Sequence, residues 1–583
     1  MKYPEISEDK KLAYLQEARD EAVELTEASR REAKEMYEYL RGNQLPWEVK
    51  NLLINRGQPI RWENIIQEID TSLDGMKRMS KTEIEVINRH EDDVHRVAVL
   101  ENLHRATLDS TSWWSEKQRA DLDLRVAGLS VIESSLVLLD EYDKQGQRLK
   151  EVKRTHIPAL ECLIDMYSRR PDYSDARYFH YDRLYDVNML KAVYGNNADK
   201  LSSNDRGMAR VTRTWYRNGD EIRIATWQED VILEDKVQPY AKTQGRFSVS
   251  IRKMHYTPHK EYYGIYRNMK PFQDDINNMM LRLKNMLGSY KMLIEDTAVD
   301  DVHTFADEYG LDNAVIAVKD GSLSQNRFKE ISLTQNISQI MSLVQDARAK
   351  ALQIMGINPE LLGTSTMRQS GVALEIKQNA GLVGLQRIIE ASANLDKDMF
   401  MIDTAIMEEH FKAEQVYSIL GTNGKKQKFY VNEYERDDKG AVIFENGKPK
   451  QKSILSVGRY DFSLNQVPFN NGSTDAKMKS WAEMMKIIDP AKAAALIPSM
   501  LRDVGSPQAK ETADILAKMD EQAAQAGNGQ AEQLQMQEIQ LAMQKMQAQI
   551  GEMQSKANLN NAKASEIAAT TPTDATVPAT KQV

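Results

Sequence analysis

The chain has 583 residues, of which 41% are hydrophobic, so it is long enough for several domains and apolar enough to fold. Its 77 Lys and Arg and 86 Asp and Glu leave a net charge of −9, which argues against a protein that grips duplex DNA over its whole surface, because that needs a basic surplus. The single cysteine, Cys162, excludes an intrachain disulfide and a cysteine-rich zinc site. The sequence shows no signal peptide and no run of about 18 apolar residues, so we expect an intracellular protein without membrane spans.

The first 270 residues predict a mixture of helices and strands. Residues 8–41 combine many charges with apolar residues at helical spacing, which predicts a solvated amphipathic helix that stops at Gly42. A short helix beginning at Trp62 is expected to end at Gly75. Helix is also expected over 89–128, and strands are expected at 82–88, 129–142, 154–165, 212–217, 221–227 and 247–251.

In the middle of the chain, two helices flank a small mixed insert. Apolar residues at helical spacing predict the first helix over 271–295 and the second over 334–355, and a strand is expected at 314–318 between them. Gly356 and Pro359 end the second helix, and a polar segment follows. Ser370 is the expected N-cap of a long helix that runs to 411.

The C-terminal part predicts strands and turns over 412–470 and helices interrupted by prolines over 471–525. Within 526–566, apolar residues alternate at three- and four-residue spacing, which predicts a helix that packs against copies of itself. The residues of this seam are Met536, Ile539, Met543, Met546, Ile550 and Met553. The Ala-, Thr- and Pro-rich residues 567–583 predict a disordered tail.

The sequence contains no recognisable catalytic motif. A phosphate-binding loop, a zinc-protease motif and a serine nucleophile elbow are all missing. His255 and His259 are separated by Pro258, which disfavours a helical metal-binding face, and Cys162 lies in an apolar segment typical of a buried, inert thiol. We therefore expect no enzyme activity, no metal and no cofactor.

Several short runs, taken in order, resemble a known family. They are 37–42 (YEYLRG), 57–59 (GQP), 169–179 (RRPDYSDARYF), 355–363 (MGINPELLG), 370–374 (SGVAL) and 460–462 (YDF). Their order resembles the portal (head-to-tail connector) proteins of tailed bacteriophages, and most closely the longer portals of short-tailed phages. The proline-split context of Trp47 departs from the family pattern and affects the correspondence over 43–60.

This resemblance implies an α+β, predominantly helical portal fold. Its implied parts are a wing, a stem of two helices, a clip between them, a tunnel loop, a crown and a C-terminal helical barrel. The implied bounds are 1–270, 370–411 and 412–470 for the wing, 271–295 and 334–355 for the stem, 296–333 for the clip, 356–369 for the tunnel loop, 471–525 for the crown and 526–566 for the barrel.

The resemblance also implies a function. A portal is a ring, expected to be a dodecamer, at one capsid vertex of the virion; it is assembled in the host cytoplasm, passes double-stranded DNA, and contacts terminase, tail adaptor proteins and capsid protein. The tunnel-loop residues at the DNA channel are then Thr364, Ser365, Thr366, Met367, Arg368 and Gln369. The candidate channel-lining cations of the stem are Arg282, Lys284, Lys291, Arg348 and Lys350.

Two other functions stay open at the sequence level. An elongated scaffolding or coiled-coil assembly protein of a viral particle would share the C-terminal seam, but it would be mostly helical. A DNA-processing enzyme with unrecognised site residues would show turnover, and the missing phosphate-binding loop counts against it.

Overall fold

The computed structural model separates the chain into two units, residues 1–419 with 426–469 and residues 420–425 with 470–583. It describes residues 3–468 except 56–59, 61–62, 89–93, 111, 143–147, 241–244, 259, 289–290, 310–315, 332–336, 356–370, 412–414, 421–425, 438–441, 446–447 and 451–459. The expected tunnel loop, Ser370, the crown, the barrel seam and the C-terminal tail lie outside these residues.

The N-terminal helix α1 (Glu8–Leu40) buries one face along its whole length. Leu15, Ala22 and Met36 on this face are each at most 2% exposed, because small and medium apolar side chains recur at helical spacing. Gly42 ends the helix with φ of 84°, and the N–H of Asn43 donates to the carbonyl of Glu38, as in a Schellman cap. The expected stop is confirmed, and the helix is a packed part of the body as well as an amphipathic one.

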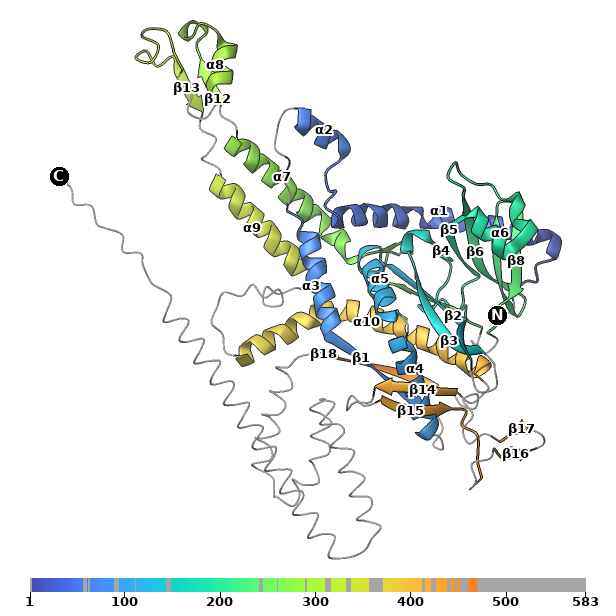
Figure 1. Ribbon diagram of the computed structural model, residues 1–583. Coiled ribbons are helices and arrows are strands. Elements are labelled where there is room, and N and C mark those ends of the chain that lie inside the picture. The colour runs from blue at the N-terminus through green and yellow to red at the C-terminus, as the bar shows by residue number, and fades with distance from the viewer. Residues whose placement is uncertain are drawn as a thin grey trace, which may run out of the picture. The chain divides into compact units, whose positions relative to one another are not determined.

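Two antiparallel sheets form the body that α1 covers (Figure 1). The five-stranded sheet has the order β4-β5-β6-β7-β8, and the hairpin between β6 and β7 turns at Gly219, whose φ is 59°. The three-stranded sheet has the order β3-β2-β9. The strand bounds are β2 Leu129–Tyr142, β3 Arg148–Ile157, β4 Cys162–Ile164, β5 Tyr178–Asp186, β6 Met208–Asn218, β7 Glu221–Gln228, β8 Val231–Val237 and β9 Val249–Lys253.

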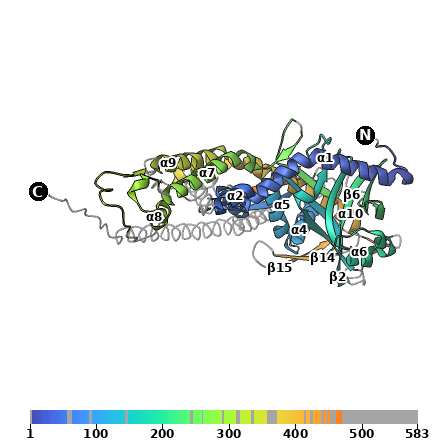
Figure 2. The same ribbon diagram turned by 90° about the horizontal axis from the view of Figure 1, so that it is seen from above.

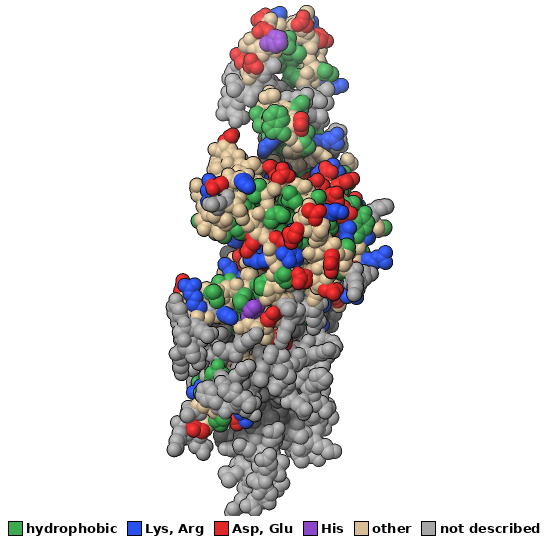
Figure 3. All heavy atoms as spheres, turned by 90° about the vertical axis from the view of Figure 1, so that its right-hand side faces the viewer, with side chains coloured by type: hydrophobic (Ala, Val, Ile, Leu, Met, Phe, Trp, Pro, Cys, Tyr) green, Lys and Arg blue, Asp and Glu red, His purple; other side chains and the backbone are tan. Residues whose placement is uncertain are grey.

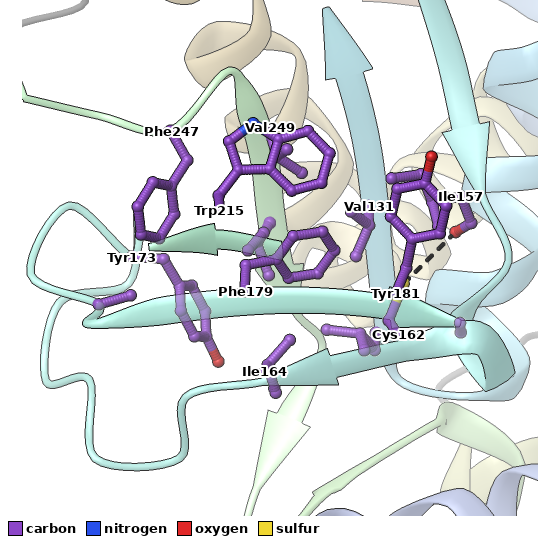
Figure 4. Packing of buried hydrophobic residues seen from close by; sticks show 14 of the residues in the cluster. Val131, Ile157, Cys162, Ile164, Tyr173, Phe179, Tyr181, Trp215, Phe247 and Val249 are labelled. Carbon is purple, nitrogen blue, oxygen red and sulfur yellow. Dashed lines mark hydrogen bonds between the residues drawn. The ribbon is translucent and has the colours of Figure 1, made fainter. Parts of the chain in front are cut away.

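Aromatic side chains from these strands fill one core (Figure 4). The rings of Phe179 and Tyr181 lie 5.6 and 5.9 Å from that of Trp215, whose indole N–H donates to the Ser248 hydroxyl at 3.0 Å. Cys162 is fully buried among them, and burial raises the pKa of its thiol. The expectation of a buried cysteine is confirmed.

A second core forms where α10 (Gly371–His410) packs on helices α4 (Val94–Ser110) and α5 (Trp113–Val126). Beside it, β1 (Ser80–Asn88) pairs with β18 (Tyr460–Pro468), so segments almost four hundred residues apart in the chain meet in one ladder. The remaining elements are α2 Trp47–Asn55, α3 Ile65–Met79, α6 Val187–Tyr194, α7 Lys270–Gly288, α8 Val302–Tyr309, α9 Ile337–Ile354, β10 His255–Tyr256, β11 Tyr262–Tyr263, β12 Lys291–Ile294, β13 Phe328–Ile331, β14 Gln415–Leu420, β15 Lys426–Val431, β16 Phe444–Glu445 and β17 Lys448–Pro449.

Two sequence expectations are wrong in detail, and one strand was not expected. Gly75 lies inside α3 instead of ending it, since a single glycine costs a helix only about 1 kcal/mol. Residues 316–318, the described part of the strand expected at 314–318, are irregular, and the strands described between α7 and α9 are β12 and β13. The strand β8 was not anticipated, although it completes the five-stranded sheet.

The surface and strand content bear on function. Acidic side chains are numerous on the face shown in Figure 3, in keeping with the net charge of −9. Within the described ranges, no helix is both long enough and apolar enough to cross a membrane. The two sheets contradict a mostly helical scaffolding protein.

Buried histidines predict that acid weakens this fold. His180 is fully buried with its Nδ1 2.7 Å from the Thr214 hydroxyl, and burial lowers its pKa to about 3. An unfolded histidine has a pKa of about 6.5, so below that pH only the unfolded chain takes up this proton. The free energy of unfolding therefore falls by up to about 1.4 kcal/mol per pH unit for this group as pH drops from about 6.5 towards 3.

Urea unfolding between pH 7 and 4 measures this slope. His180→Gln is expected to make it shallower by about one proton, whereas His303→Gln, on an exposed residue, is expected to leave it unchanged. Equal slopes for wild type and His180→Gln contradict the prediction.

Candidate functional site

The helices α7 and α9 pack side by side as an antiparallel pair joined by the insert between them (Figures 1 and 2). Apolar side chains at spacings of three and four residues hold them together and join them to α3. The contributors from α7 and α9 are Phe272, Ile276, Met279, Met280, Val344, Ala347, Ala351 and Leu352. The two helices predicted as the stem are therefore neighbours in space.

The insert closes the end of this pair with a small sheet. β12 follows α7 and pairs antiparallel with β13, and Phe305 of α8 stacks on Phe328 of β13 at 5.7 Å. The helix expected over 271–295 ends at Gly288, because Lys291–Ile294 forms a ladder with Phe328–Ile331. Lys291 consequently belongs to a strand, and its prediction as a stem-helix residue is wrong.

A buried amide network joins α7 to α3 and α1. The Gln273 Oε1 accepts from the backbone N–H groups of Ile65 and Ile66 at 3.0 and 3.3 Å, so it satisfies two donors at the start of α3. The Asn277 amide donates to Gln44 at 2.7 Å, and the Gln44 amide donates to the carbonyl of Tyr39 at 2.9 Å, near the end of α1. Because these buried amide groups are paired with one another, the network fixes the orientation of α7 relative to α1 and α3.

Sequence reasoning missed this network. Gln44, Gln273 and Asn277 are at most 4% exposed. The available signal was the pair Gln273 and Asn277, which lie four residues apart among apolar positions of one helix.

The predicted cations of the stem differ in their surroundings. The Arg348 Nη2 lies 2.6 Å from both carboxylate oxygens of Glu68, so this guanidinium fastens α9 to α3. Arg282 and Lys350 are exposed, and Lys284 is half-buried. Residues two apart on a helix point about 200° apart, so Arg348 and Lys350 cannot face the same side of α9. The structure does not bring the five predicted cations together.

The exposed sides of the pair carry little charge. α7 exposes Pro271, Asp275, Asn278 and Arg282, which include one acid and one base. The exposed residues of α9 are Ser338, Gln339, Met341, Ser342, Leu343, Gln345, Asp346, Ala349, Lys350, Gln353 and Ile354, which include one acid and one base. Surfaces of this kind offer few fixed charges to DNA phosphates.

Three ion pairs fix the second half of α10, the helix that follows the predicted tunnel loop. Asp396 lies 2.5 Å from Lys117 of α5, and Asp398 lies 2.5 Å from Arg252 of β9. These side chains are largely buried.

The third pair joins Asp403 to Arg154 of β3 at 2.6 Å, with both side chains fully buried. Burial raises the pKa of the Asp403 carboxyl, and the neighbouring Arg154 opposes that rise. The sequence did not single out these residues, although carboxylates within an apolar stretch of a long helix were a signal. Together the three pairs attach this half of α10 to α5, β9 and β3.

The described part of the chain offers no grouped ligands for a metal ion. His255 lies in β10, stacked on Tyr263 at 5.1 Å, and its Nδ1 is 3.1 Å from a guanidinium nitrogen of Arg387 on α10. His259 lies outside the described residues.

Comparison with known proteins identifies the family. The model of the phage P22-like portal protein family matches residues 16–261 and 221–560 of this chain. The portal protein of Helicobacter pylori bacteriophage KHP30 is 28% identical over 525 residues, which cover 87% of this chain and 83% of the phage protein. The resemblance seen in the short sequence runs is confirmed. This chain belongs to the phage P22-like portal protein family.

Proposed function

We propose that this phage portal protein forms a closed ring of identical subunits, expected to be a dodecamer, at one capsid vertex. Double-stranded DNA passes through the ring during packaging and ejection, and the protein is a structural part of the virion that is assembled in the host cytoplasm. The family match over most of the chain carries this proposal. A ring needs heterologous contacts that repeat around its axis and close.

The helix pair α7–α9 is the proposed stem, with its first helix ending at Gly288. The insert from β12 to β13 is then the clip, and α10 is the long wing helix. The buried amide network and the Arg348–Glu68 pair support the assignment, because a stem that bears the load of moving DNA must be fixed to its body.

The channel wall is proposed to let DNA slide instead of holding it. The nearly neutral exposed sides of α7 and α9 support this, since strong binding would require many phosphate contacts. Arg282 is the exposed cation on the α7 side, and the loop residues Met367 and Arg368 remain the proposed points nearest to the DNA.

The clip is the proposed docking site for terminase and tail adaptor proteins, while the wing contacts capsid protein. Leu293 and Leu323 of the clip are 59% and 72% exposed, so they are the apolar side chains available to a partner there. DNA movement is then driven by the docked terminase, and the portal itself performs no chemistry.

Replacing residues 364–369 by a Gly/Ser linker tests the channel assignment. Rings of the purified variant, counted in negative-stain images, are expected to be as abundant as those of wild type. The replaced residues lie in the chain between α9 and α10, and these two helices keep their own packing contacts. Genome packaging in the corresponding phage is expected to fall. Loss of rings in the variant contradicts the loop's assignment, and a wild-type protein that stays monomeric under all conditions contradicts the portal ring itself.

A further inference from the structure

The short helix α2 has five apolar residues among its nine, but its own subunit buries one of them. Leu53 is 7% exposed, whereas Trp47, Val49, Leu52 and Ile54 are 72%, 41%, 46% and 58% exposed. Four exposed large apolar side chains on one short helix form a patch of the kind that a partner covers, and a nine-residue helix is unstable alone. α2 therefore requires a surface that the described part of its own subunit does not supply.

The helix α9 has a row of side chains with matching properties. Leu343 and Ile354 are 55% and 50% exposed, and they lie eleven residues apart, so they occupy the same side of the helix three turns apart. Lys350 lies between them in this row and is exposed. We call Leu343, Lys350 and Ile354 the α9 row.

The two surfaces cannot meet within one subunit. α7 lies between α2 and α9 in both views of the molecule (Figures 1 and 2). Their exposed charges are complementary: Glu48 of α2 is exposed, the one base of α2, Lys50, is half-buried and already makes an interaction, and the α9 row carries Lys350. Complementary surfaces on opposite sides of a subunit are what a heterologous ring contact requires.

We propose that α2 of one subunit docks on the α9 row of the neighbouring copy, with Trp47 and Ile54 among the apolar contacts and Glu48 facing Lys350. This inference rests on the proposed ring and assigns a contact to it. It also places Lys350 at the subunit interface instead of on the channel wall.

Trp47→Glu tests the apolar contact in the full-length chain. The subunit concentration at which half the protein is in rings, measured by mass photometry, is expected to rise at least about tenfold, as for the loss of a large aromatic interface anchor. Trp114→Glu is the matched control, since Trp114 is 57% exposed on another helix, and its rings are expected to match those of wild type. Unchanged rings with Trp47→Glu overturn the inference.

Exchanging charges tests the partner surface. Glu48→Lys and Lys350→Glu are each expected to weaken the ring, and the double variant is expected to restore it, because the pair is then re-formed with its signs reversed. A double variant weaker than either single variant overturns the pairing.

Cross-linking tests the same contact without relying on a loss of assembly. In a chain with both Ile54→Cys and Leu343→Cys, a thiol-reactive bifunctional reagent is expected to give ladders of linked subunits, whereas each single variant gives none; buried Cys162 stays unreactive. Rings that form without such ladders overturn the docking and leave the portal ring standing. Absence of rings in the wild type instead overturns the proposed function.

Discussion

Replacing Asp403 by Leu is expected to lower the free energy of unfolding by about 3–5 kcal/mol, because it leaves the Arg154 guanidinium charged and buried without its carboxylate. The Arg154 guanidinium also lies 5.7 and 5.8 Å from the ring centres of Trp113 and Phe400, and its side chain is fully buried, so water cannot replace the lost carboxylate. Urea unfolding of the monomeric subunit, followed by tryptophan fluorescence, measures the loss.

A double variant separates the unpaired charge from the change of shape. Arg154→Met with Asp403→Leu is expected to recover most of the lost stability, since an apolar pair of similar volume often replaces a buried ion pair at little cost. Asp140→Asn is the control on an exposed pair, because Asp140 is 96% exposed and lies 3.5 Å from Arg148, and it is expected to change little. If the double variant loses as much as Asp403→Leu, the unpaired charge is not the cause.

Replacing Gly264 by Ala is expected to destabilise the subunit by about 3 kcal/mol or more, or to prevent folding. A Cβ at this position overlaps the carbonyl oxygens of Arg125 and Val126, and backbone atoms cannot turn aside as a long side chain can. Gly264 has φ of −82°, so the effect comes from crowding and not from backbone strain. Soluble yield and the thermal unfolding midpoint measure it.

Gly75→Ala is the matched control for this prediction. Gly75 lies inside α3, and a Cβ there meets no atom within 4 Å, so the alanine is expected to stabilise the helix by about 0.5–1 kcal/mol. A Gly264→Ala variant as stable as wild type contradicts the prediction, because the backbone around Gly264 and that of Arg125 and Val126 can then move apart without loss of stability.

Gly264 matters because it lies where the body meets the helix pair α7–α9. Its segment packs against the end of α5 just before the chain enters α7. Gly128, with φ of 77°, faces the same segment from the other side, so two glycines allow one close backbone approach. Neither residue stands out in the sequence, since the residues that surround them lie more than a hundred positions away.

Local patterns determined the elements of this protein but not all of their ends. The helical spacing of Ile340, Val344 and Leu352 was sufficient to predict α9, and Asn218 with Gly219 was sufficient to predict the β6–β7 hairpin. The end of α7 was misplaced because β12 exists only through pairing with β13, some forty residues later. Strand pairing at that distance leaves no local signal.

The sequence by itself determined the order of helices, insert and long helix and, through its short runs, the portal family. Only the tertiary structure decided which polar residues hold the parts together. Gln273 caps α3 and Asp403 neutralises Arg154 because distant segments bring those groups into contact, and a side chain's partners depend on the fold as a whole. The same holds for α2: its apolar residues are visible in the sequence, but only the fold shows that its own subunit leaves them exposed.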